Sequence, residues 1–312
     1  MCNIDYLFNL LMDEIDRMSL YEVFEYIKDK YLNLNTKEQA DLANYLNTFN
    51  YWGRLDKNNN EFEAFYNRAR TLKEHNKDLR WFYDKLEDYR SKIVLLGILN
   101  NWYNFDHNTI GMSKESLYKQ YFDLDILKVD KDEVFVDLGA FTGDSIIEYF
   151  YNYGEKSYKK IYCYEIDDYN IKRMENNLSK YKNIEIRKKA VVDKKGKVSF
   201  HCNGNYVSAN SVCDNGEVEV DAVALDEDIK EKITILKMDI EGSEKSAIKG
   251  SINHIKNDSP KLLISLYHNH EDIYEIPRMI DKMNNNYKYY LRFYGGNFFP
   301  TEFVLLAVPK ED

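Results

Sequence analysis

Residues 134–145 read VFVDLGAFTGDS, and this stretch decides the fold class. An apolar strand that runs into Gly139, followed by Gly143 at the start of a helix, is typical of a ligand site at the C-terminal edge of a doubly wound α/β sheet. The dinucleotide fingerprint would require further glycines where this chain has Phe141 and Asp144. A carboxylate at the helix start also opposes a phosphate, because it competes for the same backbone N–H groups. The turn therefore predicts a ligand without a pyrophosphate.

Acidic residues fall at the predicted strand ends and helix starts of this same edge. They are Asp137, Asp144, Asp239 and Glu241. Such a set suits a cation, and S-adenosylmethionine carries a sulfonium and an ammonium but no phosphate. Glu165 ends the second predicted strand, where a carboxylate can accept both ribose hydroxyls. That position would serve NAD equally well, and a glycine turn with helix-capping acids and no cofactor is the alternative.

A second block, ILKMDIEGSEKSAIKGS, covers residues 235–251. Its first four residues predict a buried strand with Asp239 at the C-terminal end. Asp239 and Glu241 have the i, i+2 spacing that places two side chains on one side of an extended chain. Both could therefore face the ligand beside the sulfonium. In the competing interpretation, Glu241 or Ser243 only caps the next helix.

A third block, LISLYHNHEDIYEIP, covers residues 263–277 and contains two histidines. A histidine at the C-terminal edge of a sheet can act as general base, and His268 is the candidate beside Asp239. Either His268 or His270 could instead be structural. Together with Asp239 and Glu241 they could ligate a divalent ion, but their spacing is specific for none, so no metal is predicted.

The pattern of apolar residues divides the 312-residue chain into two domains. Up to residue 110 the apolar positions recur every three or four residues, which predicts a helical domain broken by the polar run at residues 56–60. We expect a role in capping, oligomerisation or acceptor recognition. Residues 111–312 alternate short β-branched runs with helical stretches, which predicts an α/β domain with a largely parallel sheet.

Seven strands are expected in the second domain, and the last two could pair. An inserted hairpin or sheet extension is expected between residues 198 and 223. The predicted strands are residues 133–138, 160–165, 184–189, 233–238, 262–266, 287–293 and 303–308.

Composition excludes several classes of function. Apolar residues make up 44% of the chain and the net charge is −10, so the protein is predicted to be globular and to repel nucleic acid. No apolar run is long enough for a membrane span, and the acidic N-terminus does not resemble a signal peptide. Reduced thiols in a cytoplasmic protein are expected, because no C-x-x-C pair occurs among Cys2, Cys163, Cys202 and Cys213.

These motifs together resemble the FkbM family of S-adenosylmethionine-dependent methyltransferases. The likeness covers residues 86–308, and residues 1–80 lie outside it. Its most specific segment is KMDIEGSE. The segments that carry it are LEDYRSKIVLLGIL (86–99), VFVDLGAFTGDS (134–145), YEID (164–167), LKMDIEGSE (236–244), LYHNHEDIYEIP (266–277) and YLRFYGGNFFPTEFVLLAV (290–308).

The resemblance implies a class I methyltransferase-like, Rossmann-like fold with a seven-stranded sheet, here preceded by helices. It also implies methyl transfer to a hydroxyl of a sugar or other small molecule, with Asp239, Glu241 and His268 as catalytic candidates. Alternatives are a sugar or nucleotide-sugar binding module and an NAD-dependent oxidoreductase. A homodimer through the N-terminal helices is a further expectation. The cofactor-binding residues would be Asp137, Gly139, Ala140, Phe141, Thr142, Gly143, Glu165, Ile166 and Asp239.

Overall fold

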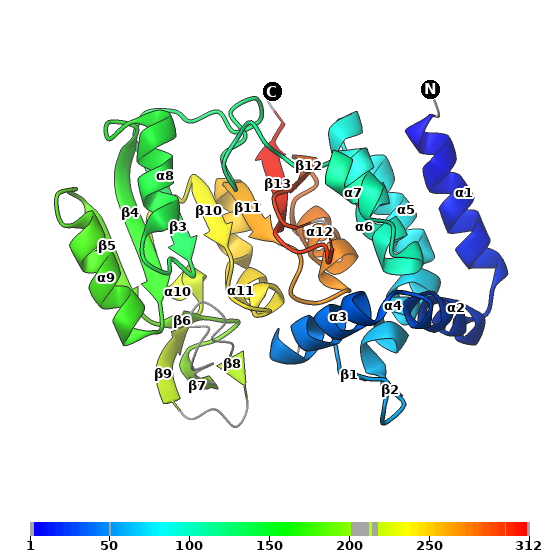
Figure 1. Ribbon diagram of the computed structural model, residues 1–312. Coiled ribbons are helices and arrows are strands. Elements are labelled where there is room, and N and C mark those ends of the chain that lie inside the picture. The colour runs from blue at the N-terminus through cyan, green and yellow to red at the C-terminus, as the bar shows by residue number, and fades with distance from the viewer. Residues whose placement is uncertain (1–2, 50, 201–211, 214–217, 297, 311–312) are drawn as a thin grey trace. The chain divides into compact units, whose positions relative to one another are not determined.

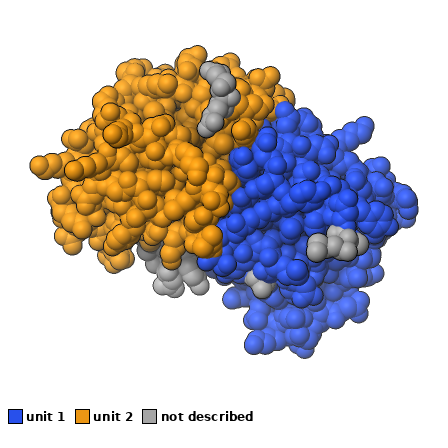
Figure 2. Space-filling view, turned by 90° about the horizontal axis from the view of Figure 1, so that it is seen from above, with its two compact units in different colours: residues 1–116, 266–278, 289–304 blue, residues 117–265, 279–288, 305–312 orange. Residues whose placement is uncertain are grey.

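The computed structural model describes residues 3–49, 51–200, 212–213, 218–296 and 298–310. Two compact units are present, and Figure 2 colours them separately. Unit 1 comprises residues 1–116, 266–278 and 289–304. Unit 2 comprises residues 117–265, 279–288 and 305–312. The helical N-terminal segment thus groups with two segments from the C-terminal third of the chain, and the expected domain boundary at residue 110 stays a prediction.

A seven-stranded sheet is the centre of the fold, with the order β12-β13-β11-β10-β3-β4-β5 (Figure 1). Pairing is parallel from β11 through β10, β3 and β4 to β5. All seven predicted strands form, and the last two are neighbours as expected. Their bounds are β3 Glu133–Leu138, β4 Tyr158–Glu165, β5 Ile184–Lys188, β10 Ile235–Met238, β11 Lys261–Ser265, β12 Tyr287–Phe293 and β13 Phe303–Pro309.

Burial explains why the central strands read as apolar runs. Every residue of β3 and β10 is buried, as expected for parallel strands covered on both faces. The two acids within β3 are each paired with a lysine, one from the adjacent β10 and one from β11 on the far side of β10. Glu133 contacts Lys261 at 2.6 Å, and Asp137 contacts Lys237 at 2.9 Å. The charged residues of β3 and β10 thus belong to ion pairs between strands.

Helices follow the strands of unit 2 along the chain, and Figure 1 shows α8 and α9 beside β3, β4 and β5. Gly143 precedes α8, and Asp167 caps α9 by accepting from the N–H groups of Tyr169 and Asn170. The elements are α8 Asp144–Tyr153, α9 Asp168–Leu178, α10 Leu225–Asp228, α11 Glu244–Lys249, the π-helix η2 His254–Asp258 and α12 Asp272–Met283.

A second, four-stranded sheet has the order β6-β9-β7-β8. Its strands are β6 Ala190–Val191, β7 Gly196–Phe200, β8 Val212–Cys213 and β9 Val218–Val223. Strand β7 pairs antiparallel with both β8 and β9. The expected inserted sheet is therefore present. Residues 201–211 and 214–217, which formed part of that expectation, lie outside the described residues, as do Cys2 and Cys202, whereas Cys163 is a buried free thiol.

The first 112 residues form seven helices within the described part of the chain, which confirms the helical expectation. A capping box joins Ser19 and Glu22 at the start of α2, and Asp88 and Asp106 cap α6 and α7. The polar run at residues 56–60 lies in a short hairpin, in which β1 pairs antiparallel with β2. The bounds are α1 Ile4–Arg17, α2 Leu20–Leu32, α3 Thr36–Phe49, β1 Leu55–Asp56, β2 Glu61–Phe62, α4 Glu63–Glu74, α5 Asn76–Lys85, α6 Tyr89–Asn104 and α7 His107–Met112.

Within the described ranges, no helix combines the length and the apolar character that a bilayer crossing requires.

Candidate active site

The glycine turn after β3 depends on the absence of a side chain at residue 139. Gly139 has φ +76°, and a Cβ atom there would lie 1.9 Å from the backbone oxygen of Asp239. Gly143 has φ +78°, and its Cβ would lie 2.9 Å from Cδ1 of Leu178. Position 139 therefore requires glycine for conformation and for space, whereas position 143 requires it for its conformation, because the Leu178 side chain can shift. The turn brings the end of β3 against the end of β10, as the motif predicted.

Glu165 at the end of β4 ties the turn to the neighbouring strand. Its Oε2 accepts from the backbone N–H of Phe141 at 2.9 Å. Its Oε1 accepts from the N–H groups of Ile166 at 2.8 Å and Asp167 at 2.9 Å. Burial raises the pKa of this carboxyl, and the three N–H donors oppose that shift. Glu165 therefore occupies the strand end expected for a ribose-binding acid and also shapes the turn.

The turn residues between the two glycines differ in exposure. Ala140 and Thr142 are buried, whereas Phe141 is half-buried and has φ +47°. A positive φ is uncommon for a bulky residue, so the N–H bond to Glu165 helps to hold this conformation. Ile166, on the facing strand end, is also half-buried.

Asp137 is fully buried and belongs to an internal ion pair. Its Oδ1 lies 2.9 Å from Nζ of Lys237, and its Oδ2 accepts from the hydroxyl of Ser145 at the start of α8. Lys237 also donates to the carbonyl oxygen of Gly139 at 2.7 Å. Burial alone would lower the pKa of Lys237, but the neighbouring carboxylates, chiefly Asp137 and Asp239, raise it above its ordinary value. Asp137 thus holds the strand ends together from inside the sheet.

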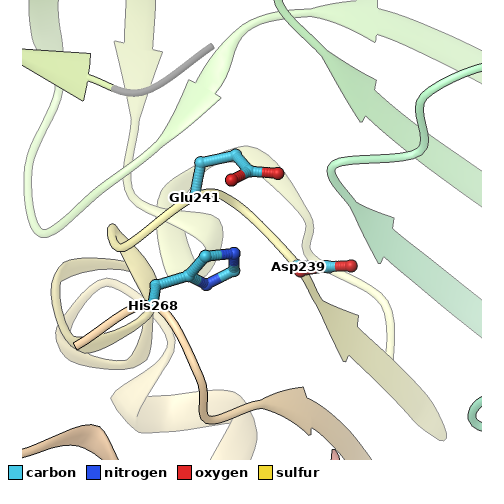
Figure 3. Close-up of side chains that lie close together, drawn as sticks. All are labelled: Asp239, Glu241 and His268. Atoms are coloured by element: carbon cyan, nitrogen blue, oxygen red, sulfur yellow. The ribbon is translucent and has the colours of Figure 1, made fainter. Parts of the chain in front are cut away.

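Asp239 follows β10 directly and is half-buried (Figure 3). The hydroxyl of Tyr121 donates to its Oδ2 at 2.6 Å. Oγ of Ser265, the last residue of β11, lies 3.2 Å from the same hydroxyl and can donate to it. Tyr121 is itself buried, has φ +72°, and carries Nζ of Lys237 5.4 Å above its ring. These contacts hold one oxygen of the Asp239 carboxylate in a defined place.

Glu241 and Gly242 form the turn between β10 and α11, with φ +55° and +93°. Both are half-buried, and Figure 3 shows Glu241 on this turn beyond Asp239. The turn is fastened by Glu244, whose buried Oε1 accepts from the N–H of Ile240 at 2.8 Å. Ser243 occupies the N-cap position of α11, and its side chain makes no capping hydrogen bond. A ligand-binding role for Glu241 stays a prediction.

The two histidines of the third block are both buried and belong to unit 1. The ring of His268 contacts Tyr51 at 5.4 Å and Tyr267 at 4.3 Å between centroids. His270 packs edge-on against Trp102 at 4.7 Å. Burial lowers the pKa of His270 well below its ordinary value, so its imidazole is neutral. A buried imidazole that resists protonation is poorly suited to acid–base catalysis, which argues against that role for His270, and a catalytic role for His268 stays a prediction.

Unit 2 therefore brings together the glycine turn, Glu165 and Asp239 at one edge of the parallel sheet. Sequence reasoning missed two residues of this group. Lys237 carried a signal, because a lysine inside the apolar run ILKM predicts a buried ion pair. Tyr121 lies outside every motif, and its residue type and spacing gave no indication of its place.

Comparison with known proteins was consistent with these motifs. Residues 137–290 match the family model of the methyltransferase FkbM domain. The chain is similar to the crystal structure of methyltransferase FkbM from Methylobacillus flagellatus KT, with a TM-score of 0.65, 22% identity, and coverage of 78% of this chain and 64% of that one. It thus spans less than two thirds of that protein's length. This likeness confirms the class I methyltransferase-like fold with its preceding helices.

Two further solved structures are too dissimilar to bear on function. An rRNA methylase from Streptococcus thermophilus has a TM-score of 0.37 and 12% identity, over 59% of this chain and 90% of that one. Fibrillarin from Aeropyrum pernix, in complex with S-adenosyl-L-methionine, has a TM-score of 0.35 and 11% identity, over 58% and 67%. Among curated proteins, none matches the sequence.

Proposed function

From the methyltransferase FkbM domain that residues 137–290 form, we propose that this enzyme transfers the methyl group of S-adenosylmethionine to a hydroxyl of a sugar or other small molecule. The observation that carries the proposal is the meeting of the glycine turn with the end of β10. A Cβ atom added at Gly139 would lie 1.9 Å from the backbone oxygen of Asp239, so the two segments touch, and the hydroxyl of Tyr121 holds the Asp239 carboxylate.

The chemistry of this edge fits S-adenosylmethionine better than a dinucleotide. Asp239 and Glu241 are half-buried carboxylates that favour a cationic ligand, and Asp144 at the start of α8 disfavours a phosphate there. Glu165 keeps unused lone pairs on oxygens that already accept from backbone N–H groups, so it can also accept from ribose hydroxyls. These features support the cofactor assignment.

The bound cofactor would supply a methyl group on a positively charged sulfur, which is an already activated electrophile. The chain's own residues then have to orient the acceptor and remove its proton, and a positioned base typically contributes 10²–10⁴-fold. Asp239 is the first candidate base. The 2.6 Å hydrogen bond from the hydroxyl of Tyr121 fixes Oδ2 and so sets the orientation of this carboxylate. Tyr121 would thus act as a positioning residue.

His268 is the second candidate base. It lies four residues beyond Ile264, which pairs in register with Met238 just before Asp239. Parallel neighbours end at the same edge of a sheet, and this supports keeping His268 as a candidate. An imidazole and a carboxylate ordinarily titrate in different pH ranges, so the pH dependence of the rate distinguishes the two kinds of base.

The family match favours a methyltransferase over the two alternatives. A binding module would take up the cofactor without turnover, and an oxidoreductase would bind NADH. Calorimetry with S-adenosylhomocysteine and NADH separates them. We expect Glu165→Ala to lower the affinity for S-adenosylhomocysteine by roughly 10–150-fold, which corresponds to the loss of about 1.5–3 kcal/mol for a charged hydrogen bond. Glu231→Ala, which removes a half-buried carboxylate bonded to Tyr162, is the control. Uptake of NADH alone would overturn the cofactor assignment.

A screen of small hydroxylated acceptors with radiolabelled methyl donor would identify the substrate and permit a test of the base. We expect Asp239→Asn to slow methyl transfer at least tenfold, or about 1.4 kcal/mol, with little change in thermal stability. Tyr121→Phe should lower kcat with unchanged cofactor affinity, and Tyr162→Phe, which removes a similar hydroxyl–carboxylate bond, should not. If His268 is the base, His268→Ala abolishes the rising pH limb instead. Wild-type rates in all of these variants would refute the proposed site.

We also propose that the helical segment supports self-association. Exposed apolar side chains on its first two helices, Tyr6, Leu10 and Tyr21, support this assignment. Sedimentation of the intact chain and of a Leu10→Lys variant tests it. A dimer is expected for the first and a monomer for the second, whereas a monomeric wild type would contradict the proposal.

A further inference from the structure

Arg68, in the middle of α4, is a fully buried cation in unit 1. Its Nη1 donates to the backbone oxygen of Trp102 at 3.1 Å. Its Nε and Nη2 have no hydrogen-bond partner among the described residues. A guanidinium presents five N–H donors in a plane, so most of its hydrogen-bonding capacity is unused.

No carboxylate of the described chain compensates this charge, and burial lowers the pKa of Arg68 to about 9. The contrast is Arg292, which is also buried in unit 1. Its Nη2 lies 2.7 Å from Oδ2 of Asp88, and its Nη1 donates to Ser91. Because buried charges in proteins are normally paired, the unpaired Arg68 indicates that its partner comes from outside the described chain.

Aromatic rings surround the guanidinium of Arg68. Its central carbon lies 5.4 Å from the ring centroid of Phe65, 5.5 Å from Phe105 and 5.6 Å from Phe299. Cation–π contacts of this kind stabilise the charge through the faces of the rings. They do not satisfy the N–H groups that lie in the guanidinium plane. The rings make the surroundings of the guanidinium apolar, and this strengthens any hydrogen bond made to those groups.

Two more residues of the described chain have buried polar atoms without a partner: Trp102, whose backbone oxygen accepts from Arg68, and His270, whose pKa the charge of Arg68 helps to lower. Nε1 of Trp102 and Nε2 of His270 are buried and accept or donate no hydrogen bond within the described ranges. The rings of these two residues are 4.7 Å apart. An indole nitrogen only donates, as a guanidinium does. The side chains of Arg68 and Trp102 therefore offer only donors, and the neutral imidazole of His270 can present a further N–H in its Nε2–H tautomer.

We propose that Arg68, Trp102 and His270 form a binding site for an oxyanion, the carboxylate or phosphate group of a small acidic ligand. A planar pair of N–H groups matches the two oxygens of such a group in a bidentate arrangement. The aromatic walls favour a ligand whose remaining part is apolar or flat. The site lies entirely within unit 1, and the inference does not depend on the methyltransferase proposal.

Thermal unfolding of the intact chain tests this site with acetate, benzoate and phosphate, each compared with sodium chloride at equal ionic strength. A ligand that binds only the folded protein raises the melting temperature as its concentration rises. We expect a rise with at least one of these anions for the wild type and none for Arg68→Met. A response to phosphate alone would indicate a phosphorylated ligand, and a response to acetate or benzoate a carboxylic acid.

Arg292→Met is the matched control, because it removes a buried arginine whose carboxylate partner lies in the chain. It should lower the melting temperature and keep the response to anions. If Arg68→Met does not fold, Arg68→Lys provides the test, because lysine keeps the positive charge but lacks the planar pair of N–H groups. The rise in melting temperature caused by the anion should then be at least twofold smaller than in the wild type. Equal responses in wild type and the Arg68 variant, or no anion-specific response in the wild type, would overturn the proposal and indicate that water alone occupies the cluster.

Discussion

Replacement of Lys237 by methionine tests the buried ion pair beneath the glycine turn. The substitution keeps the length of the side chain and removes its charge. Asp137, which is fully buried, then loses the cation 2.9 Å from its Oδ1, and the carbonyl of Gly139 loses a donor at 2.7 Å. The hydroxyl of Ser145 is then the main polar group left to stabilise the Asp137 carboxylate.

The expected cost follows from the burial of both partners. Breaking one side of a buried pair typically destabilises a protein by about 3–5 kcal/mol, because it leaves an uncompensated charge. For a domain of this size each 1 kcal/mol lowers the melting temperature by about 2–4 °C. The additional change Asp137→Asn removes the unpaired charge, so the double variant should recover most of the loss.

Urea denaturation followed by circular dichroism measures the free energy of unfolding of each variant. The control is Lys197→Met, because Lys197 and Glu219 form a pair of 2.6 Å in which both side chains are about 60% exposed. An exposed pair contributes about 0–1 kcal/mol. If Lys237→Met loses no more stability than Lys197→Met, or if Asp137→Asn recovers nothing, the reasoning about this pair is wrong.

Three further predictions concern the turn, the cofactor site and the helical unit. Gly139→Ala should lower the affinity for S-adenosylhomocysteine at least tenfold, as measured by calorimetry, because the added Cβ would lie 1.9 Å from the backbone oxygen of Asp239. The control Gly196→Ala, whose added Cβ has no neighbour within 4 Å, should bind it with wild-type affinity. Cofactor affinity should fall on acidification at a pH above 4.5, because burial raises the pKa of Glu165 and a protonated carboxyl group is a poor hydrogen-bond acceptor. Glu165→Gln should remove this pH dependence. A variant with the same pH profile as wild type would contradict the prediction. The free energy of unfolding should fall by up to about 1.4 kcal/mol per pH unit below roughly pH 6.5, because His270 binds a proton only in the unfolded state. In denaturation series at several pH values, His270→Phe should flatten this slope. A slope equal to that of wild type would show that His270 is not its cause.

Local sequence patterns predicted the elements of the sheet because burial and strand periodicity are local properties. The bounds of β3 and β12 agree with the predicted residues 133–138 and 287–293. The glycine turn and the strand-end acid Glu165 were also predicted, since a tight turn requires particular residue types at particular positions. The strand order is not written in any one segment and was not predicted; the family resemblance implied only a seven-stranded, class I methyltransferase-like fold.

The tertiary structure alone decided which side chains meet. Tyr121 donates to Asp239 across 118 residues of chain, and no periodicity encodes such a contact. Asp137 was expected at the ligand edge, yet its carboxylate lies inside the sheet and pairs with Lys237, because the register of β3 and β10 sets the two residues opposite each other. Arg68 had the spacing of an ordinary helix residue, and only the packing of α4 against α6 and Phe299 makes it a buried, unpaired charge. A sequence determines which residues prefer burial, whereas the path of the chain determines which charges are buried together.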